Sequence, residues 1–300
     1  MEKIAYISSG ITNFINLDTY THESFISWVE SQEFDFSTFM SSDDSFSLIV
    51  KGEYARLASI DTQIVGYAFS CMMYESYLNT IGKPAYVSGY SMGVFSALYA
   101  AESISLVSGL SLILQLNELI SNSDFQNEDK FSMATIIGLD KKALQYFTKD
   151  INNIEIVNQN ADTNFIISGE EVALRLLEKK ISDNSSILFF KSLQIDTPYH
   201  SKLLSRFKKD WASILRYHEI HSPNIPVVSA TTLEILTTKS SSIYELERNF
   251  CSSFSWLGVL KKMRELGVKD LYQCGVNKEL YKIGKYSGVN HNYHWINKSE

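Results

Sequence analysis

The chain has 300 residues, of which 45% are hydrophobic and 20% are charged, and its formal net charge is −7. This composition is ordinary for a globular protein with a large buried core, and the negative charge argues against a general affinity for nucleic acid or for membranes. The first residues lack the charged-then-apolar order of a signal peptide, and no apolar run approaches the roughly 18 residues of a membrane span. We therefore expect a cytoplasmic protein.

The three cysteines, Cys71, Cys251 and Cys274, are far apart in the sequence and show no metal-ligand spacing. We expect them to be reduced structural thiols. Nothing in the sequence indicates a bound metal or a cofactor.

The first part of the chain alternates predicted strands with apolar helices. A strand is predicted at Lys3–Ser8, and Asp61 is predicted to cap an apolar helix that runs to about Leu78. The serine- and aspartate-rich stretch Ser37–Asp44 is predicted to be a loop. Two further helices are predicted at 21–30 and 106–120, and a polar linker is predicted at 121–130.

Beyond the linker the predicted elements follow the order β-α-β-β-α-β, which is the split βαβ arrangement. They are predicted at 131–137, 141–149, 154–158, 164–168, 170–181 and 187–195. This order indicates a small subdomain inserted into a larger α/β domain. We therefore divide the chain into a large α/β domain, 1–125 and 196–300, and a small subdomain, 126–195.

The larger domain is predicted to resume at about Asp196. Its elements are a helix at 201–215, a strand at 225–229, helices at 244–251 and 255–266, a strand at 270–274 and a helix at 278–285. The polar and aromatic segment 286–300 receives no predicted element.

Residues 89–93 read G-Y-S-M-G and fit the pattern G-x-S-x-G. The pattern is typical of a sharp strand-to-helix turn that holds a nucleophilic serine, here Ser91, clear of the sheet. The glycines allow the backbone to pass close to itself, and the N–H of Met92 at the helix start is a natural donor to an oxyanion. An ordinary strand–helix turn is the alternative interpretation, since a five-residue pattern alone is weak evidence.

Several motifs then follow in an order typical of one family. They are G-Y-S-M-G-V-F-S-A-L-Y-A-A at 89–101, M-A-T-I-I-G-L-D at 133–140, N-Q-N-A-D-T-N-F-I-I-S-G at 158–169, Y-H-S at 199–201 and S-W at 255–256. With these motifs the chain resembles the malonyl-CoA:acyl-carrier-protein transacylase family, including the acyltransferases of polyketide synthesis, over about residues 60–285. The resemblance implies a large α/β-hydrolase-like core with a parallel sheet and a small inserted ferredoxin-like subdomain.

The resemblance also implies a mechanism through an acyl-serine. Ser91 would take an acyl group from a thioester, and His200 would act as general base and then as general acid. In this family backbone carbonyls orient the imidazole, so no triad aspartate is required. Gln63 matches a family position near the active site, although a buried amide that only ties helices together is the alternative. Tyr90 and Tyr199 adjoin the two catalytic residues and are further candidates for substrate contact.

One departure from the family bears directly on the substrate. Malonyl-specific members carry an arginine about 25 residues beyond the nucleophile, and its planar fork holds the malonyl carboxylate. Counting from Ser91 gives Leu116, and no arginine occurs between Arg56 and Arg175. Because a leucine cannot pair with a carboxylate, we expect a neutral acyl group at this position and not malonyl.

Other departures concern the oxyanion hole and the serine turn. The family's N-terminal glycine–glutamine turn aligns with residues 10–14, which places Ile11 where the oxyanion glutamine should be. Asn13 is a weaker candidate to replace that glutamine in the oxyanion hole. The residue before the serine is usually histidine, and in this chain it is Tyr90.

Three hypotheses remain open at this point. The first is an acyltransferase that moves an acyl group from CoA or a carrier thioester to an acyl-carrier protein in polyketide or fatty-acid synthesis. The second is an editing hydrolase that strips acyl groups from carrier proteins with the same Ser91 and His200. The third is a non-catalytic carrier-protein binding partner. The expected partners are an acyl-carrier protein and an acyl-CoA or acyl-carrier thioester, with no nucleic acid and no membrane.

Overall fold

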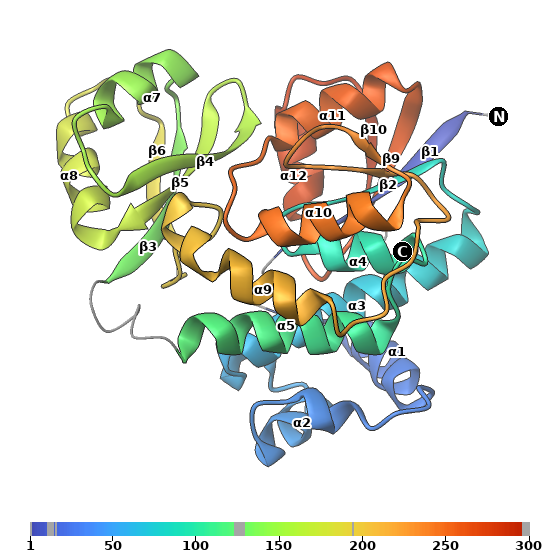
Figure 1. The fold of residues 1–300 in the computed structure, drawn as a ribbon. Helices are drawn as coiled ribbons and strands as arrows, with labels where there is room; N and C mark the ends of the chain where they lie inside the picture. The colour runs from blue at the N-terminus through green and yellow to red at the C-terminus, as the bar shows by residue number, and fades with distance from the viewer. Residues whose placement is uncertain (1, 11–14, 16, 123–129, 194, 296–300) are drawn as a thin grey trace.

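The computed structural model describes residues 2–10, 15, 17–122, 130–193 and 195–295, and it shows a mixed α/β fold built on two sheets (Figure 1). The larger sheet has the strand order β10-β9-β1-β2-β7-β8, and the smaller one has the order β4-β5-β3-β6. The predicted fold class, a parallel α/β core with a second, inserted sheet, is confirmed.

The larger sheet is parallel except at one edge. Its strands are β1 (Lys3–Ser8), β2 (Tyr86–Gly89), β7 (Val227–Val228), β8 (Ile235–Leu236), β9 (Val268–Cys274) and β10 (Asn292–His294). The central strand β1 pairs in parallel with β2 and β9, and only the short β7–β8 pair is antiparallel. The last four residues of β1 are all buried, as expected for a parallel strand that is covered on both faces.

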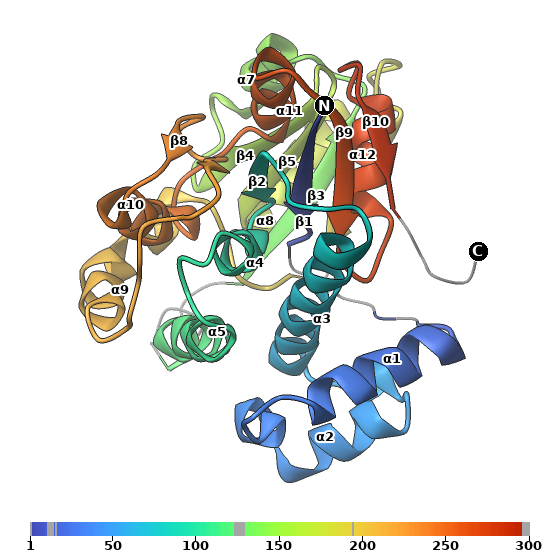
Figure 2. The same ribbon diagram turned by 90° about the vertical axis from the view of Figure 1, so that its right-hand side faces the viewer.

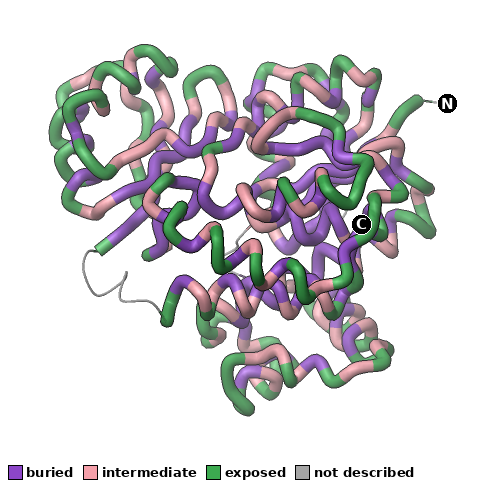
Figure 3. The backbone as a smooth tube through the Cα atoms, in the orientation of Figure 1, coloured by how far each residue is buried: buried purple, intermediate pink, exposed green. Residues whose placement is uncertain are grey.

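Helices cover both faces of this sheet, as Figure 2 shows. On one face α3 (Ser59–Thr80), α4 (Gly93–Ala100) and α5 (Leu106–Ser121) pack around Tyr6 of β1. On the other face α11 (Trp256–Glu265) and α12 (Glu279–Tyr286) pack around Ala5 and Ile7. Alternate residues of β1 therefore anchor two separate hydrophobic clusters, which form the buried centre of Figure 3.

The smaller sheet is antiparallel and is covered by helices on one face only. Its strands are β3 (Phe131–Ile137), β4 (Ile154–Ala161), β5 (Asn164–Glu170) and β6 (Phe189–Leu193), and its helices are α7 (Lys141–Thr148) and α8 (Glu171–Ile181). The covered face buries Ala134, Ile136, Phe165 and Ile167 against the two helices. The opposite face, with Met133 and Ile166, is turned toward the larger domain. All these elements lie within the predicted range 126–195, although the domain division itself stays a prediction.

The N-terminal helices correct two predictions. This region holds α1 (Thr19–Glu30), the 3-10 helices η1 (Phe36–Phe39) and η2 (Tyr54–Arg56), and α2 (Asp43–Val50). The predicted loop Ser37–Asp44 is therefore wrong, because η1 occupies part of it and α2 begins at Asp43. Asp61 is not a helix cap either, since α3 begins at Ser59. Its buried carboxylate instead accepts hydrogen bonds from the backbone and side chain of Ser41, each at 2.7 Å, and from the hydroxyl of Ser45.

The C-terminal third differs from its prediction in details. The predicted helix 201–215 is a 3-10 segment, η3 (Lys202–Phe207), followed by α9 (Lys208–Leu215). The helix predicted from Tyr244 begins earlier, as α10 (Lys239–Asn249), because Thr238 and Ser241 form a capping box there. The two-residue β8 and the edge strand β10 had no prediction. Ile11, Asn13 and most of the predicted linker lie outside the described residues.

The described residues include no helix that combines the length and the hydropathy of a membrane crossing. Cys71, Cys251 and Cys274 are buried free thiols.

Candidate active site

Ser91 stands at a strained turn between β2 and α4. Its φ is +55°, a backbone conformation that costs free energy for any residue with a Cβ. The turn closes so tightly that a Cβ on Gly89 would overlap the backbone of Gly93, and a Cβ on Gly93 would overlap the carbonyls of Ser8 and Ser9. The structure therefore explains both glycines of the G-x-S-x-G pattern by close backbone packing.

His200 lies directly against this serine. Its Nε2 is 2.6 Å from the Oγ of Ser91, although 109 positions separate the two residues in the sequence. Its other ring nitrogen, Nδ1, lies 2.6 Å from the backbone carbonyl oxygen of Asn249 at the end of α10. The backbone of His200 is itself held, with φ at +64° and its N–H donating to the carbonyl of Phe250 at 2.7 Å.

These contacts determine which of the two ring nitrogens of His200 carries the proton. A carbonyl oxygen can only accept, so Nδ1 must be the protonated nitrogen of the neutral ring, and Nε2 is free to accept from the hydroxyl of Ser91. Burial lowers the pKa of His200 to about 4, against the weaker opposing effect of its bond to the Asn249 carbonyl. The imidazole is therefore neutral at pH 7 and ready to act as a base. Among the described residues no carboxylate forms a hydrogen bond with the His200 ring, and Asp196 is exposed.

The oxyanion side of the site is built from backbone. The N–H groups of Gly93, Val94 and Phe95 donate to carbonyls within the turn. Among the described residues the N–H of Met92 has no hydrogen-bond partner, and it directly follows Ser91, as an oxyanion donor should. A small pocket next to it is lined by Met92, Gly10 and Gln63. Gln63 is buried and shares this pocket with Met92, the residue after the serine, and its role stays a prediction.

Tyr90 is fixed in the wall of the site by polar and aromatic contacts. Its hydroxyl accepts from the Nδ2 of Asn158 at 2.8 Å, and its ring packs edge-on against Phe254 and Trp256. The backbone N–H of Trp256 donates to the Oδ1 of Asn158, which sets the orientation of that amide. The ring of Phe254 also packs against His200, with centroids 4.7 Å apart. One aromatic side chain thus packs against both His200 and Tyr90, the residue before the serine.

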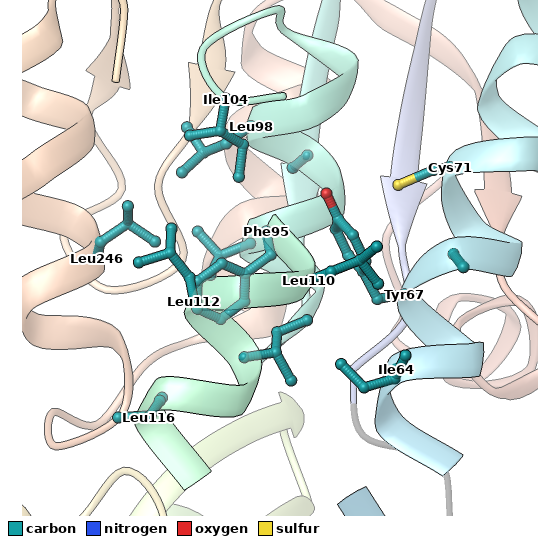
Figure 4. Close-up of a cluster of buried hydrophobic side chains, with 14 of the residues drawn as sticks. Ile64, Tyr67, Cys71, Phe95, Leu98, Ile104, Leu110, Leu112, Leu116 and Leu246 are labelled. Atoms are coloured by element: carbon teal, nitrogen blue, oxygen red, sulfur yellow. The ribbon is translucent and has the colours of Figure 1, made fainter. Parts of the chain in front are cut away.

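Leu116 does not lie where the sequence count suggested. Figure 4 shows it on α5 within the hydrophobic cluster that also contains Phe95 and Leu112, and it is 4% exposed. It does not appear among the described residues that line either pocket beside Ser91. Ile113, one turn earlier on α5, lines the small pocket instead. The expectation that Leu116 contacts substrate therefore has no support in the geometry, because the side chain is buried in the core.

A cavity of about 630 Å³ opens from the catalytic pair between the two sheets. Ser91, His200, Tyr90 and Tyr199 line one end of it. The rest of its wall comes from the open face of the smaller sheet and from α12. Burial raises the pKa of Tyr199 to about 12, so this side chain is neutral at pH 7. A cavity of this size is typical of small-molecule sites.

The structure thus brings together Ser91, His200, Met92, Tyr90 and Tyr199, and it places Gln63 close by. Sequence reasoning missed three contributors: the carbonyl of Asn249, the amide of Asn158 and the ring of Phe254. Asn158 is the first residue of the motif at 158–169 that supported the resemblance, but nothing in the motif indicated what its side chain does. Every residue has a backbone carbonyl, so the residue type at position 249 could not indicate that this carbonyl accepts a hydrogen bond from His200.

No protein-family model matches the chain. It is 29% identical over 224 residues to the malonyl CoA-acyl carrier protein transacylase of Buchnera aphidicola subsp. Schizaphis graminum, which covers 72% of this chain and 70% of that one. It is also 25% identical over 242 residues to the polyketide biosynthesis protein ThaF of Burkholderia thailandensis, covering 79% of this chain and 20% of that longer protein. These matches agree with the resemblance to the malonyl-CoA:acyl-carrier-protein transacylase family that the sequence motifs indicated.

Solved structures show the same fold. FabD from Acinetobacter baumannii superposes with a TM-score of 0.82 over 99% of this chain and 95% of that one, at 20% identity. A malonyl-transacylase in complex with its type II PKS acyl-carrier protein (PlMCAT:AntF) gives a TM-score of 0.83 over 99% and 96%, also at 20% identity. At 20% identity these structures show the fold alone, and the curated relatives agree with the enzyme class that the resemblance implied, an acyltransferase.

Proposed function

We propose that this enzyme transfers a neutral, non-malonyl acyl group from a CoA or carrier-protein thioester, through an acyl-Ser91 intermediate, to an acyl-carrier protein. The observation that carries the proposal is the 2.6 Å contact between Ser91 Oγ and His200 Nε2 at the end of a large cavity. The relatives named as transacylases and the polyketide protein ThaF support the acyl-carrier context.

The reaction follows from the protonation state of His200. As Ser91 Oγ attacks the thioester carbonyl carbon, His200 Nε2 accepts the hydroxyl proton, and the carbonyl oxygen becomes an oxyanion next to the N–H of Met92. The C–S bond breaks, and the departing thiolate takes the proton from Nε2. In the second half-reaction the thiol of the carrier protein gives its proton to Nε2 and its sulfur attacks the acyl carbon. The ester C–O bond to Ser91 then breaks, and the serine oxygen takes the proton back from Nε2.

The preference for a neutral acyl group rests on the charges around the site. Among the described residues that line the cavity, the cations are His200, if protonated, and two lysines, Lys191 and Lys282. No arginine lines it, and the burial of His200 keeps that ring neutral. Lys191 and Lys282 come from β6 and α12 and not from the serine turn, so we expect a malonyl carboxylate next to Ser91 to lack the paired charge that it needs away from water.

Intact-mass analysis of the wild type and of Ser91→Ala, after exposure to acetyl-CoA and to malonyl-CoA, tests the proposal. We expect a one-acyl mass increase with acetyl-CoA in the wild type only, with malonyl loading at least about ten-fold slower. Equal loading of malonyl and acetyl would show that the substrate assignment is wrong. Failure of every thioester to label Ser91 would favour the non-catalytic hypothesis.

A second experiment separates transfer from hydrolysis, since both share the first half-reaction. The acyl-enzyme is incubated with a carrier protein that bears a free phosphopantetheine thiol. We expect acylated carrier protein as the main product. Release of free acid at the same rate with and without carrier would instead identify an editing hydrolase.

A further inference from the structure

The cavity floor is the open face of the smaller sheet, and the strand register arranges its side chains in rows. In the first row Met133 of β3 lies opposite Leu193 of β6, and both line the cavity. In the next row Thr135 lies between Ile166 and Lys191. The third row contains Asn164 and Phe189, on either side of Ile137. Among the residues that line the cavity, the first row is therefore apolar, whereas the second and third rows each add polar or charged side chains; Ser168, opposite Met133 on β5, is not one of the described lining residues.

The apolar end of this floor is the one beside the catalytic pair. Met133 belongs to the core cluster of the larger domain, together with Val157 and Tyr199. The carbonyl of Val157 accepts from the N–H of Phe254 at 2.9 Å, and Phe254 packs on His200. Lys191 belongs to the next row out from Met133 and Leu193, farther from this core along β3.

A separate polar strip runs along the other side of the cavity. Asn158, which holds the Tyr90 hydroxyl, donates to the Oδ1 of Asn160 at 2.7 Å, and Asn160 in turn lies 3.4 Å from Asn164. All three amides line the cavity, as do Lys191 and Lys282. A pantetheine arm carries two amides and ends in a phosphate, so its chemistry matches the amides and the lysines. The apolar row formed by Met133 and Leu193 would then contact the acyl group.

We propose that the pocket formed by Met133, Val157, Leu193, Ile195 and Tyr199 binds an unbranched, apolar acyl chain longer than acetyl. The proposal rests on the proposed function and adds the class of acyl group that Ser91 accepts. Each methylene that enters the pocket leaves water and adds to binding, by about four-fold per CH₂ at the usual transfer free energy. A charged acyl group gains nothing from these five side chains and loses its hydration.

Single-turnover acylation of Ser91 by acetyl-CoA, butyryl-CoA and hexanoyl-CoA, followed by intact mass, tests the pocket. For the wild type we expect kcat/KM to rise by about four-fold per added methylene from acetyl to hexanoyl. Leu193→Trp fills the pocket, so we expect it to lower the ratio of hexanoyl loading to acetyl loading by at least about ten-fold. Leu193→Ala enlarges the pocket and is expected to move the optimum toward octanoyl-CoA.

Leu188→Trp is the matched control, because Leu188 directly precedes β6, is 78% exposed and does not line the cavity. It should leave the hexanoyl-to-acetyl ratio unchanged. If Leu193→Trp lowers acetyl and hexanoyl loading equally, the row contacts the pantetheine arm and the inference is wrong. The inference alone also fails if the wild type loads acetyl but shows no gain with chain length. Failure of the proposed function has a different signature, namely malonyl loading as fast as acetyl, or no loading at all.

Discussion

The two walls of the active site are built in different ways. The wall on the larger sheet carries Ser91 and His200, which adopt strained backbone conformations and are fixed by main-chain contacts from Gly93, Asn249 and Phe250. The wall on the smaller sheet is an open face of ordinary extended strands, and only its side chains meet the cavity. Changes in the first wall should therefore alter the rate for every substrate, whereas changes in the second should alter which substrate is preferred.

The largest effect is expected for His200→Ala, which removes the base from the first wall. We expect kcat/KM to fall by about 10⁴-fold or more with acetyl-CoA and hexanoyl-CoA alike. His218→Ala is the control, since His218 follows α9, contacts Gln115 of α5 and is not among the described residues that line the cavity, and it should retain full activity. If His200→Ala changed the ratio of kcat/KM for hexanoyl-CoA to kcat/KM for acetyl-CoA, the first wall would also affect substrate preference, which contradicts the distinction drawn above.

Gly93→Ala tests how far the first wall depends on close backbone packing. The added Cβ would meet the backbone carbonyls of Ser8 and Ser9, which cannot move as a side chain end can. We expect a loss of about 3 kcal/mol in the free energy of unfolding, measured in urea, together with loss of activity. Gly267→Ala controls for backbone strain alone, because its φ is +80° but no atom lies within 4 Å of the new Cβ, and it should cost about 1 kcal/mol.

The depressed pKa of His200 predicts two pH effects. Because the folded-state pKa is about 4, acylation of Ser91 should keep its rate down to about pH 5 and lose it near pH 4. The unfolded chain takes up this proton near pH 6.5, so His200 favours unfolding increasingly as the pH falls from 6.5 toward 4, by at most about 3 kcal/mol.

Urea unfolding of the wild type and of His200→Gln, at pH 7 and at pH 4.5, isolates this contribution. We expect the wild type to lose more stability than the variant over this interval. Equal losses would show that His200 is not held neutral by burial.

The smallest effect is expected for Tyr90→Phe, at the junction of the two walls. The change leaves the Nδ2 of Asn158 without its bond to the Tyr90 hydroxyl but keeps the bond to Asn160. We expect a loss of about 1 kcal/mol in stability, measured in urea. Activity with acetyl-CoA should fall by less than about ten-fold, because the ring that packs on Phe254 remains. A loss as large as that of His200→Ala would assign Tyr90 a direct catalytic role.

Sequence patterns predicted the scaffold of the first wall well. Strand β1 has the predicted bounds, because its apolar residues and the glycine after it give a clear local signal. The paired glycines around Ser91 likewise report a local steric need. Asp61 was misread because its partners, Ser41 and Ser45, lie sixteen to twenty residues away and leave no local pattern. Leu116 was misplaced because a count along the chain does not say which side of α5 faces the serine.

The second wall was much less predictable. The alternation of the strands was recognised, but which face stays uncovered depends on where α7 and α8 pack, and that is decided by contacts across the whole subdomain. The short strands β8 and β10 escaped prediction for a similar reason, since each exists only through pairing with a neighbour.

The 109-position separation between Ser91 and His200 has a consequence for synthesis on the ribosome. The serine turn emerges long before its base, and the carbonyl that orients the base follows another 49 positions later. A nascent or truncated chain that ends before residue 249 therefore lacks the imidazole or the carbonyl that orients it, and its Ser91 hydroxyl has no complete base arrangement to accept its proton.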